Sequence, residues 1–570
     1  MKRLVLDIET NLSHKTIWLC VTKDISSGEI KVWKRANDLW DYIKDATLIM
    51  HNGLSFDAPV LNRIWKTKIR KAQVYDTLLV SRLLEPSREN GHSLESWGNT
   101  LGFPKIDYKA VWQWLEGRRE AYKGECFDNP HPGLLSTYCV RDDGVTEKLF
   151  HFLEAALKEK GFSEESVQLE HDVAAIIYEQ EQNGFKLDTI AATCLLTDVK
   201  GKLDRIYEQM QERWPAYEVE RISAKTGKQL KPVLVTFNPG SRKQIGEKLQ
   251  ELGWKPKKFT ETGQAIVDEG SLASAKFPEA VLIAEYLMLQ KRVAQIESWL
   301  EHVGPDGRVH GRVVTNGAVT GRMTHSGPNM AQIPNAGSVY GPECRACWTV
   351  EEGNVLVGVD ASGLELRMLA HYMKDEDYVR TVCEGSSKLG TDVHTVNQRA
   401  AGLDTRDAAK TFIYAFLYGA GDSKIGSIVG GSAKAGAQLK AAFLSKTPAL
   451  GKLIKAVASN ATTGAVPGLD GRKIWVRSEH AALNSLLQGA GAIVMKKALV
   501  ILNTKIRTNK WPIKMVANVH DEWQMETQEK YATIVGKAGV DSIREAGEYF
   551  KLRCPLDGEF KYGKNWKDTH

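Results

Sequence analysis

The sequence predicts an α/β fold divided into several domains. Its 570 residues exceed what one hydrophobic core holds, and at about 150 residues per domain they suggest roughly four domains. Two patterns support this division. Residues 1–155 alternate strands, turns and helices, whereas residues 170–300 are mostly helical beyond a polar linker at 159–170. The remainder predicts short strands, a strand-to-helix unit at 355–373, helices at 390–460 and 479–504, and a hairpin around residue 521.

Composition excludes several classes of protein. No apolar run approaches the ~18–20 residues of a membrane span. The sequence also has no GxxxxGK[ST] phosphate-binding loop, so an ATPase site is not expected. The eight cysteines are scattered, as in a reducing cytosol. Cys344 and Cys347 have zinc-knuckle spacing, but no second Cys/His pair follows, so we expect two structural cysteines on a strand. The net charge of +6 permits a nucleic-acid partner without demanding one.

The first strand, "LVLDIET" at 4–10, carries two carboxylates, Asp7 and Glu9. Side chains at i and i+2 of a strand point to the same face, so these charges repel each other. Alone, such a pair is most often a solvated strand edge. A divalent cation with oxygen ligands would make the pair favourable.

Two later segments supply further ligands of the same kind. "HNGLSFD" follows the apolar strand "TLIM" and ends at Asp57, and "YCVRD" puts Tyr138 and Asp142 on one face of a helix. Four carboxylates and a tyrosine near the ends of elements suit a pair of divalent cations. Two such cations support phosphodiester cleavage, which is the chemistry that we expect here.

A second set of carboxylates lies in the C-terminal half. The strand in "VLVGVDASGLELRMLAHYM" ends at Asp360, and the turn in "IKMVANVHDEWQMET" holds Asp521 and Glu522. Ser362 with Glu365 also fits a simple capping box, and "HDE" also fits any polar hairpin tip. A charge at the end of an apolar strand is expensive, however, unless a cation neutralises it.

The helix in "TRDAAKTFIYAFLYG" carries a functional stripe. Arg406, Lys410, Tyr414 and Tyr418 recur every four residues along one face, and Thr405 or Asp404 can cap the helix start. A positive helix terminus with Arg and Lys suits a triphosphate, and the tyrosines suit a sugar and a base. The opposite face, which includes Phe412, is apolar and serves the core.

Three polar side chains and one basic segment are candidate DNA contacts. Arg322, Asn484 and Gln488 are donors that could check the minor-groove acceptors present in every correct base pair, although polar helix decoration explains Asn484 as well. The loop at 238–258 holds Arg242 and Lys243 beside a helix N-terminus, which suits backbone phosphates. A solvated helix face explains this segment nearly as well.

The trio "DIET", "NGLSFD" and "YCVRD" resembles the three motifs of proofreading 3′–5′ exonucleases with a ribonuclease-H-like fold. The resemblance implies that Asp7, Glu9, Asp57 and Asp142 bind two Mg²⁺ ions and that Tyr138 orients the attacking water.

Stretches such as "NGAVTGR", "DASGLELR", "AKTFIYAFLYGAGD", "GLDGRK" and "VHDE" resemble the family A (DNA polymerase I type) DNA polymerases, above all the replicative enzymes of T-seven-type short-tailed bacteriophages. The resemblance covers nearly the whole chain. It implies that Asp360, Asp521 and the Ala361 carbonyl hold two further Mg²⁺ ions, with Glu522 close by and Mn²⁺ as an alternative metal.

The same resemblance implies roles for the nucleotide contacts. His394, Arg406 and Lys410 would bind the triphosphate of a dNTP, and Tyr414 with Glu365 would exclude a ribose 2′-hydroxyl. Tyr418 would lie near the template base. Arg322 and Gln488 would contact the minor groove of the primer–template.

The domains expected from the resemblance follow in order along the chain. They are an exonuclease domain (1–158), a linker and thumb (159–305), a palm (306–375 and 476–570) and inserted fingers (376–475). In well-known relatives a large thumb loop recruits thioredoxin. Here the short segment 219–235 leaves little room for that loop, so thioredoxin is not an expected partner.

The expected activity is template-directed DNA synthesis with 3′–5′ proofreading, in the cytoplasm of an infected bacterial host and without a membrane partner. A phage helicase-primase and a single-strand binding protein are candidate partners. Three alternatives are a single-subunit RNA polymerase, a non-enzymatic DNA-binding subunit and a stand-alone exonuclease. The exonuclease motifs and the pair Tyr414 and Glu365 argue against the first. The complete set of carboxylates argues against the second, and residues 300–570 would be unexplained by the third.

Overall fold

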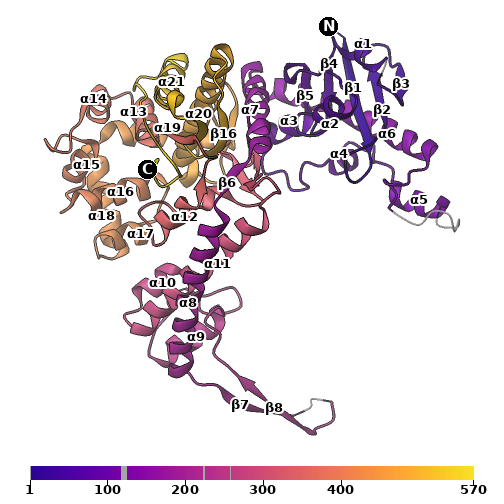
Figure 1. Cartoon of the computed structure of the whole chain (residues 1–570). Coiled ribbons are helices and arrows are strands. Elements are labelled where there is room, and N and C mark those ends of the chain that lie inside the picture. Colours follow the sequence, from indigo (N-terminus) through magenta and orange to yellow (C-terminus); the bar gives the residue numbers. More distant parts are fainter. Residues whose placement is uncertain (1, 37, 117–124, 223–224, 257) are drawn as a thin grey trace.

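The computed structural model describes the whole chain except residues 1, 37, 117–124, 223–224 and 257. Figure 1 shows three parts. An N-terminal body in indigo and violet is followed by helix α7 (Glu164–Asn183), which leads into the rest of the chain. A pair of long helices, α8 (Thr189–Arg213) and α11 (Pro278–Glu301), extends downward to a projecting hairpin. The orange and yellow C-terminal part packs on the other side of α7.

A five-stranded mixed sheet forms the centre of the N-terminal body. Its strands are β1 (Arg3–Thr10), β2 (Ile17–Asp24), β3 (Ile30–Trp33), β4 (Thr47–Met50) and β5 (Val74–Asp76), in the order β3-β2-β1-β4-β5. Strand β2 is antiparallel to both of its neighbours, whereas β1, β4 and β5 run parallel. The central position therefore belongs to β1, the strand that carries the paired carboxylates.

Helices cover both faces of this sheet. They are α1 (Leu39–Ile43), α2 (Asp57–Ile64), α3 (Thr77–Leu84), α4 (Leu94–Thr100), α5 (Tyr108–Glu116) and α6 (Pro132–Glu159). On β1, Leu4 and Leu6 pack into a core with α1 and α2, while Val5 packs against Phe150 of α6. Because side chains alternate along a strand, Asp7 and Glu9 share the Val5 face, on the side of α6.

The polar linker predicted at 159–170 is wrong in its extent. Helix α6 ends at Glu159, and α7 begins at Glu164, where the side chain of Ser163 accepts a hydrogen bond from the Ser166 N–H (3.0 Å). The polar residues that suggested a linker belong to the capped first turns of α7. One of them, Glu170, is buried because it belongs to an ionic cluster.

A buried ionic cluster fastens α7 to the C-terminal part. Arg472 reaches Glu170 at 2.5 Å and Asp470 at 2.7 Å, and Lys496 also reaches Glu170. All four side chains are almost fully buried. Burial favours the neutral form of Glu170, but the two cations hold its pKa below the ordinary value, whereas burial lowers the pKa of Lys496 to about 8. The charges of the cluster thus compensate one another inside the interface.

Three hydrogen bonds join the N-terminal side to the same region. The Ser163 hydroxyl donates to the Asp470 carbonyl, the Trp475 indole donates to the Leu84 carbonyl (2.8 Å), and the Asn316 amide donates to the Leu79 carbonyl (3.1 Å). The N-terminal body is therefore attached at several points.

The hairpin consists of β7 (Tyr217–Ile222) and β8 (Gln229–Val235), where the sequence analysis had only a short connecting segment. It projects from the end of the α8–α11 pair, clear of the other elements (Figure 1). The predicted loop at 238–258 is also partly wrong, because Ser241 caps helix α9 (Arg242–Glu251) within it. A short helix, α10 (Glu269–Ser274), completes this end of the molecule.

A four-stranded antiparallel sheet lies at the centre of the C-terminal part, in the order β16-β17-β13-β18. Its strands are β13 (Asn354–Ala361), β16 (Lys514–Val519), β17 (Glu522–Gln528) and β18 (Gly558–Gly563). Helices α13 (Leu364–Met373), α20 (Ala482–Asn509) and α21 (Glu529–Tyr549) share one hydrophobic core with it. Smaller strands are β6 (Phe185–Leu187), β9 (Arg308–Val309), β10 (Arg312–Val314), β11 (Thr324–Ser326) and β12 (Trp348–Thr349).

A helical lobe is inserted between β13 and β17. It contains α14 (Glu376–Glu384), α15 (Val393–Ala401), α16 (Arg406–Leu417), α17 (Asp422–Ile428), α18 (Ala433–Lys446) and α19 (Pro448–Ala461), followed by the strand pair β14 (Ala465–Pro467) and β15 (Lys473–Trp475). The sequence predicted helices over 390–460, and α15 to α19 occupy that range.

The prediction that no apolar run approaches the length of a membrane span does not hold for the segment that contains α20. Among the described residues, one helix, Glu479–Asn509, has the length and composition to cross a membrane. Most of it is buried inside the protein, where Leu486, Ile493 and Leu499 belong to the largest core. Its hydropathy reflects a core helix.

The two cysteines with zinc-knuckle spacing lie on a helix rather than on a strand. Cys344 belongs to α12 (Gly341–Ala346), and Cys347 is its C-cap. Both are buried, and burial raises their pKa values to about 11 and about 12. Protonated thiols inside a core are poor metal ligands, so a structural role is supported.

Candidate active sites

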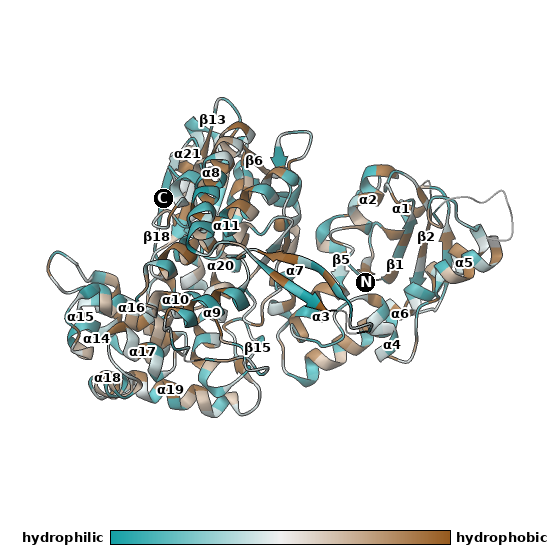
Figure 2. Cartoon of the chain, turned by 90° about the horizontal axis from the view of Figure 1, so that it is seen from below, coloured by the Kyte–Doolittle hydropathy of each residue, from teal (hydrophilic) through white to brown (hydrophobic). Residues whose placement is uncertain are grey.

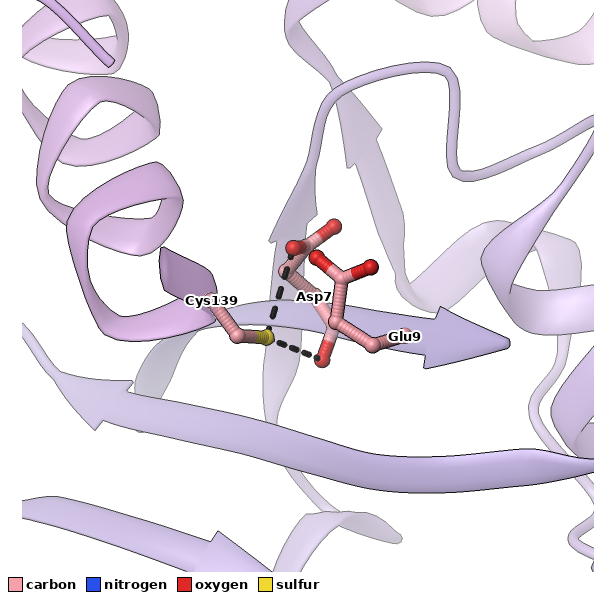
Figure 3. A group of neighbouring side chains, drawn as sticks. All are labelled: Asp7, Glu9 and Cys139. Carbon is pink, nitrogen blue, oxygen red and sulfur yellow. Dashed lines mark hydrogen bonds between the residues drawn. The ribbon is translucent and has the colours of Figure 1, made fainter. Parts of the chain in front are cut away.

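The first group of predicted ligands comes together on one side of the N-terminal sheet. Asp7 and Glu9 project from β1, and Asp57 is the first residue of α2. The Ile8 N–H donates to Oδ1 of Asp57 at 3.3 Å, which holds α2 against β1. The thiol of Cys139 on α6 donates to Oδ2 of Asp7 at 3.4 Å, as Figure 3 shows. Ligand atoms of Asp7, Glu9 and Cys139 lie within 4.8 Å of one another.

The carboxylates of this group destabilise one another. Burial raises the pKa of Asp7 to about 7, and the charge of Asp142 adds to the shift. Burial and then the charge of Asp7 raise the pKa values of Glu9 and Asp57 well above their ordinary values. Oδ1 of Asp142 is buried without a hydrogen-bond partner in the described part of the chain. An oxygen-rich, mutually repelling set with an unpartnered oxygen fits hard divalent cations.

Lys105 is a member of this site that the sequence analysis missed. Its Nζ lies 2.6 Å from Oδ2 of Asp142 and 4.9 Å from the centre of the Tyr138 ring. These contacts keep Tyr138 and Asp142 beside the paired carboxylates. Lys105 follows Pro104 in an irregular segment, where no periodicity indicates its direction.

Asp143 and Cys139 were also missed. Both oxygens of Asp143 are buried and lack a hydrogen-bond partner among the described residues, and burial raises its pKa well above the ordinary value. The pKa of the Cys139 thiol is raised in the same way, so Cys139 is a hydrogen-bond donor and not a thiolate ligand. The doubled aspartate in "YCVRDD" was the available signal for Asp143.

The second group lies at one end of the C-terminal sheet. Asp360 is the penultimate residue of β13, and its register places it opposite Glu522 on β17 and Glu559 on β18. Asp521 lies in the turn between β16 and β17, next to His520 with its positive φ of 57°. The Ala361 N–H donates to the Asp521 carbonyl at 3.1 Å, so the backbone holds the two strand ends together.

Asp360 and Asp521 also have raised pKa values. Partial burial of the carboxyl and the charges of Asp521, Glu522 and Glu559 raise the pKa of Asp360 to about 7. Burial raises the pKa of Asp521 as well. Asp360 remains exposed at the strand end, so an ion can reach it. The donor set again suits a divalent cation with oxygen ligands.

Glu522 differs from these two residues because its carboxylate is already occupied. It is buried and accepts hydrogen bonds from the side chains of Gln524 and Trp566, and Nε2 of His570 lies 3.0 Å away. Burial opposes ionisation, but the bonds from His570 and Gln524 hold the pKa of Glu522 below the ordinary value. These contacts fix the start of β17. The sequence analysis missed Trp566 and His570 as parts of the site.

The predicted stripe lies on helix α16. Thr405 caps the helix by accepting a hydrogen bond from the Ala408 N–H (3.1 Å), while Phe412 on the opposite side is buried. Arg406 pairs with Asp392 at 2.9 Å, and Lys410 is exposed.

His394 on α15 lies beside this stripe. Its ring centroid is 6.1 Å from that of Tyr414, and its Nδ1 is buried without a partner among the described residues. Burial, Arg406 and Lys410 lower the pKa of His394. The side chains that crowd this end of α16 thus form a cationic and hydrogen-bonding surface.

Glu365, at the first turn of α13, connects two other predicted residues. It accepts a hydrogen bond from the Tyr418 hydroxyl (2.8 Å) and pairs with Arg322 (3.1 Å). The ring of Tyr414 lies 6.3 Å from that of Tyr418. The sequence analysis linked Glu365 with Tyr414, so the hydrogen bond from Tyr418 is an addition.

The remaining predicted DNA contacts fall into two places. Asn484 and Gln488 are half-buried on α20, which also lines a narrow cavity with Arg322 and Asp521. Arg242 and Lys243 are exposed in the first turn of α9, at the end of the molecule that carries the hairpin. The structure does not bring this second pair to either carboxylate group.

The chain is similar in sequence to known proteins. The family model for DNA polymerase family A matches residues 202–568. DNA-directed DNA polymerases of Enterobacteria phage T3 and Escherichia phage T7 are each 34% identical over 714 aligned positions, which cover all of this chain and all of the relative.

A solved structure shares the fold. It is the POL domain of Pol1 from M. smegmatis in complex with DNA primer-template and dNTP, with a TM-score of 0.78, 19% identity, and coverage of 99% of this chain and 95% of that chain. The family match and the full-length relatives confirm the resemblance to family A DNA polymerases. The chain belongs to DNA polymerase family A.

Proposed function

We propose that this chain is a template-directed DNA polymerase with a 3′–5′ proofreading exonuclease, and that it replicates phage DNA in the cytoplasm of an infected bacterium. The observation that carries the proposal is the pair Asp360 and Asp521, held at adjoining strand ends near the cationic face of α16 in a family A chain. The phage relatives are named DNA-directed DNA polymerases, which supports the same activity here.

The proposed domains keep the boundaries expected from the sequence. Residues 1–158 form the exonuclease, 159–305 the linker and thumb, 306–375 and 476–570 the palm, and 376–475 the fingers. The order β3-β2-β1-β4-β5, with only β2 reversed, supports a ribonuclease-H-like exonuclease fold. The helical lobe inserted between β13 and β17 supports fingers that interrupt a palm.

Asp360, Asp521 and the Ala361 carbonyl would hold two Mg²⁺ ions at the polymerase site. When bound, such ions activate the primer 3′-hydroxyl and stabilise charge on the attacking and leaving oxygens of an in-line displacement. The chain's own contribution is positioning. Glu522 acts indirectly in this proposal, because its bonds to Gln524, Trp566 and His570 fix the strand that follows Asp521.

The incoming dNTP would lie along α16. Arg406 and Lys410 would bind the triphosphate together with His394, whose buried Nδ1 has no hydrogen-bond partner among the described residues. Asp392 holds Arg406 in place before the nucleotide arrives. Tyr414 would pack on the incoming sugar and base and, with Glu365, would exclude a ribose 2′-hydroxyl. Tyr418 would lie near the template base. The minor groove would be contacted by Arg322, Gln488 and Asn484.

At the exonuclease site, Asp7, Glu9, Asp57 and Asp142 would hold two more Mg²⁺ ions. Tyr138 would orient the attacking water, and Lys105 fixes Tyr138 and Asp142 in place. Mn²⁺ is the expected substitute at both sites, because it accepts the same oxygen ligands.

One experiment tests both activities. A mismatched primer–template is incubated with Mg²⁺, either without nucleotides, with deoxynucleotides or with ribonucleotides. We expect trimming without nucleotides and extension with deoxynucleotides only. Extension with ribonucleotides would indicate an RNA polymerase, and the absence of any extension would refute the proposal.

Tyr414 is expected to decide how sugars are tolerated. A tyrosine hydroxyl beside the sugar fills the gap left by a missing 3′-hydroxyl, so the native enzyme should accept dideoxynucleotides well. Tyr414→Phe removes that group and should raise discrimination against them by roughly 10- to 100-fold, the value of one lost hydrogen bond to a charged group. Competition between dideoxy- and deoxynucleotides measures this ratio.

Glu365→Ala should admit ribonucleotides, but it also releases Tyr418 and Arg322. Glu365→Gln is the matched control, because it keeps the side-chain volume and can still accept the Tyr418 hydrogen bond. Unchanged sugar selectivity in both Tyr414→Phe and Glu365→Ala would contradict the placement of this helix face over the sugar.

Processivity is expected not to depend on thioredoxin. One face of a hairpin with strands of 6 and 7 residues is small against the roughly 800 Å² that each partner contributes to a stable, specific interface. Exposed phosphate contacts such as Arg242 and Lys243 would hold the DNA instead and weaken steeply with salt. A phage helicase-primase and a single-strand binding protein are the partners that we propose.

Single-hit primer extension across a salt series, with and without reduced thioredoxin, measures this dependence. Products of equal length in both series are the expected result. A large increase in product length on adding thioredoxin would overturn the expectation and leave the polymerase assignment intact.

A further inference from the structure

Two cysteines from distant parts of the chain, Cys383 and Cys554, are in contact. Their Sγ atoms lie 3.5 Å apart, although 171 positions separate the residues in the sequence. Cys383 lies in the last turn of α14, and Cys554 lies between α21 and β18. The sulfur atoms of a disulfide bond are about 2.0 Å apart, so the two side chains would have to approach by about 1.5 Å. Side-chain rotation and a small shift of the helix end can supply that movement.

Arg367 on α13 lies against this pair. Its Nη1 donates a hydrogen bond to Sγ of Cys383 at 3.7 Å and another to the Pro555 carbonyl, while its Nε donates to the Ser362 carbonyl at 2.8 Å. Arg367 is buried, so these contacts fix the position of its guanidinium. A guanidinium beside a thiol stabilises the thiolate, which is the nucleophilic form of cysteine. The surroundings of Cys383 therefore favour thiol chemistry.

The two thiols differ in accessibility, which sets the order in which they react. Cys383 is half-buried, whereas Cys554 is fully buried. Burial, followed by the hydrogen bond with Cys383, raises the pKa of Cys554 to about 12. A reagent from solvent therefore meets Cys383 first, and Cys554 is placed to react with the sulfur of Cys383 next to it.

Simple core packing is the alternative explanation of the pair. Cys554 belongs to the largest core, and Cys383 packs against that core. Free cysteine does behave as a small apolar residue, which accounts for the burial of Cys554. It does not account for a guanidinium that is directed at the sulfur of the half-buried Cys383.

A bond between the two sulfurs would join the helical lobe to the C-terminal sheet. Cys383 belongs to the first helix of the lobe. Cys554 precedes β18, which pairs with β13 alongside Asp360. The Ser362 N–H also donates to the Asp557 carbonyl at 3.0 Å, so the segment around Cys554 is held to the strand end that carries Asp360. The bond would thus tie α14 to the strands that position this carboxylate.

The same lobe has to move when a nucleotide enters the proposed site. The Tyr418 hydroxyl at the end of α16 donates to Glu365 on α13 at 2.8 Å. The two sides of the site therefore touch each other, and a nucleotide can enter between them only if they separate. Movements of this kind limit the turnover of many enzymes. A covalent bond between α14 and the sheet would restrain the separation.

We propose that Cys383 and Cys554 form a reversible disulfide bond that fastens the helical lobe to the sheet and slows DNA extension under oxidising conditions. This inference rests on the proposed polymerase function, because the bond acts on extension. In Figures 1 and 2 helices α14 to α16 and the N-terminal body lie at opposite sides of the molecule, so trimming should continue. Oxidation would then shift the enzyme from synthesis toward trimming.

A low-molecular-weight disulfide, glutathione disulfide, is the oxidant. The Cys383 thiolate attacks one of its sulfurs, the glutathione S–S bond breaks, and one glutathione thiolate leaves. The Cys554 thiol then gives its proton to that thiolate and attacks the Cys383 sulfur of the mixed disulfide, from which the second glutathione leaves and takes up the proton lost by Cys383. The protein has lost two hydrogens, and the oxidant has become two thiols. A reduced dithiol reverses both steps, as in the transient disulfides of cytosolic proteins.

The first test counts thiols. Cys194, which is exposed, is replaced by Ser so that it forms no mixed disulfide of its own. The full chain is incubated with glutathione disulfide, denatured, and labelled with a thiol reagent. The native sequence has eight cysteines, so the Cys194→Ser protein should show seven thiols before oxidation and five after it. Peptide mapping should find Cys383 joined to Cys554. Seven thiols after oxidation, or a bond between other cysteines, would overturn the proposal.

Two further variants in the Cys194→Ser background separate the two steps. Cys554→Ala keeps the attacking thiol but lacks its partner, so it should stop at the mixed disulfide and retain one glutathione per chain. Cys383→Ser lacks the attacking thiol and should bind no glutathione. Equal labelling of these two variants would contradict the assigned order of reaction.

The second test measures extension and trimming on one primer–template. Oxidation of the Cys194→Ser protein should slow extension several-fold and leave trimming at its native rate, and dithiothreitol should restore extension. The matched control, Cys383→Ser, should extend primers equally before and after the same treatment. Native extension by a protein with five thiols, or the same loss in the control, would show that the bond does not restrain the lobe. Failure of the reduced, unaltered enzyme to extend primers would instead refute the proposed function.

Discussion

Asp521→Asn is expected to abolish primer extension and to leave primer trimming intact. The substitution removes a negatively charged ligand from the turn between β16 and β17 while keeping its size. Electrostatic stabilisation at a reacting phosphate is worth roughly 10³-fold per essential group, so extension should fall by about that factor or more. The N-terminal site shares no residue with this turn, so trimming should continue at the native rate.

Extension and trimming are measured on the same primer–template, with circular dichroism as a check of folding. Glu559→Gln is the matched control, because Glu559 also faces Asp360 across the sheet but is not a proposed ligand. It should retain most of the extension rate. Parallel loss of both activities in a folded Asp521→Asn protein would show that the two-site assignment is wrong.

The combined substitution Asp7→Ala and Glu9→Ala should have the opposite effect. It removes half of the proposed ligands at the N-terminal site, so degradation of single strands should fall by roughly 10³-fold or more. Extension should remain, and mismatched primers should be extended more readily because they are no longer trimmed. The fold should tolerate the change, since both carboxylates are destabilised by their neighbours.

Degradation of a labelled single strand and extension of a mismatched primer measure the two effects. Asp143→Asn is the control at this site, because Asp143 is a buried neighbour of Asp7 but is not a proposed ligand. It should keep its trimming activity. Native degradation by the double variant would exclude Asp7 and Glu9 from catalysis.

Local periodicity explains what the sequence could predict. Alternation along β1 placed Asp7 and Glu9 on one face, and the four-residue spacing on α16 separated its polar stripe from Phe412. Apolar runs that stop at a charged residue predicted the strand ends at Asp360 and Asp521. Each of these signals lies within one element, and the family resemblance joined the elements to one another.

Contacts between distant segments carry no such signal. Glu522 is held by Trp566 and His570, and Lys105 reaches Asp142 from an irregular segment. Glu170 looked like part of a polar linker until Arg472 and Lys496 supplied its partners from more than 300 residues away in the sequence. A buried charge is recognised only when the residues that compensate it are known.

The buried cluster of Glu170, Arg472 and Lys496 also bears on how a misincorporated nucleotide would be removed. Breaking such a pair costs about 3–5 kcal/mol, and hydrogen bonds at Leu79 and Leu84 tie the N-terminal body down as well. The two proposed catalytic sites are thus held at fixed positions relative to each other, and moving one toward the other would be costly. The 3′ end of the DNA primer would therefore have to move between the two sites, which requires it to separate from its template. Editing would then be paced by how readily the last base pairs open, so it would be faster where they are A·T than where they are G·C.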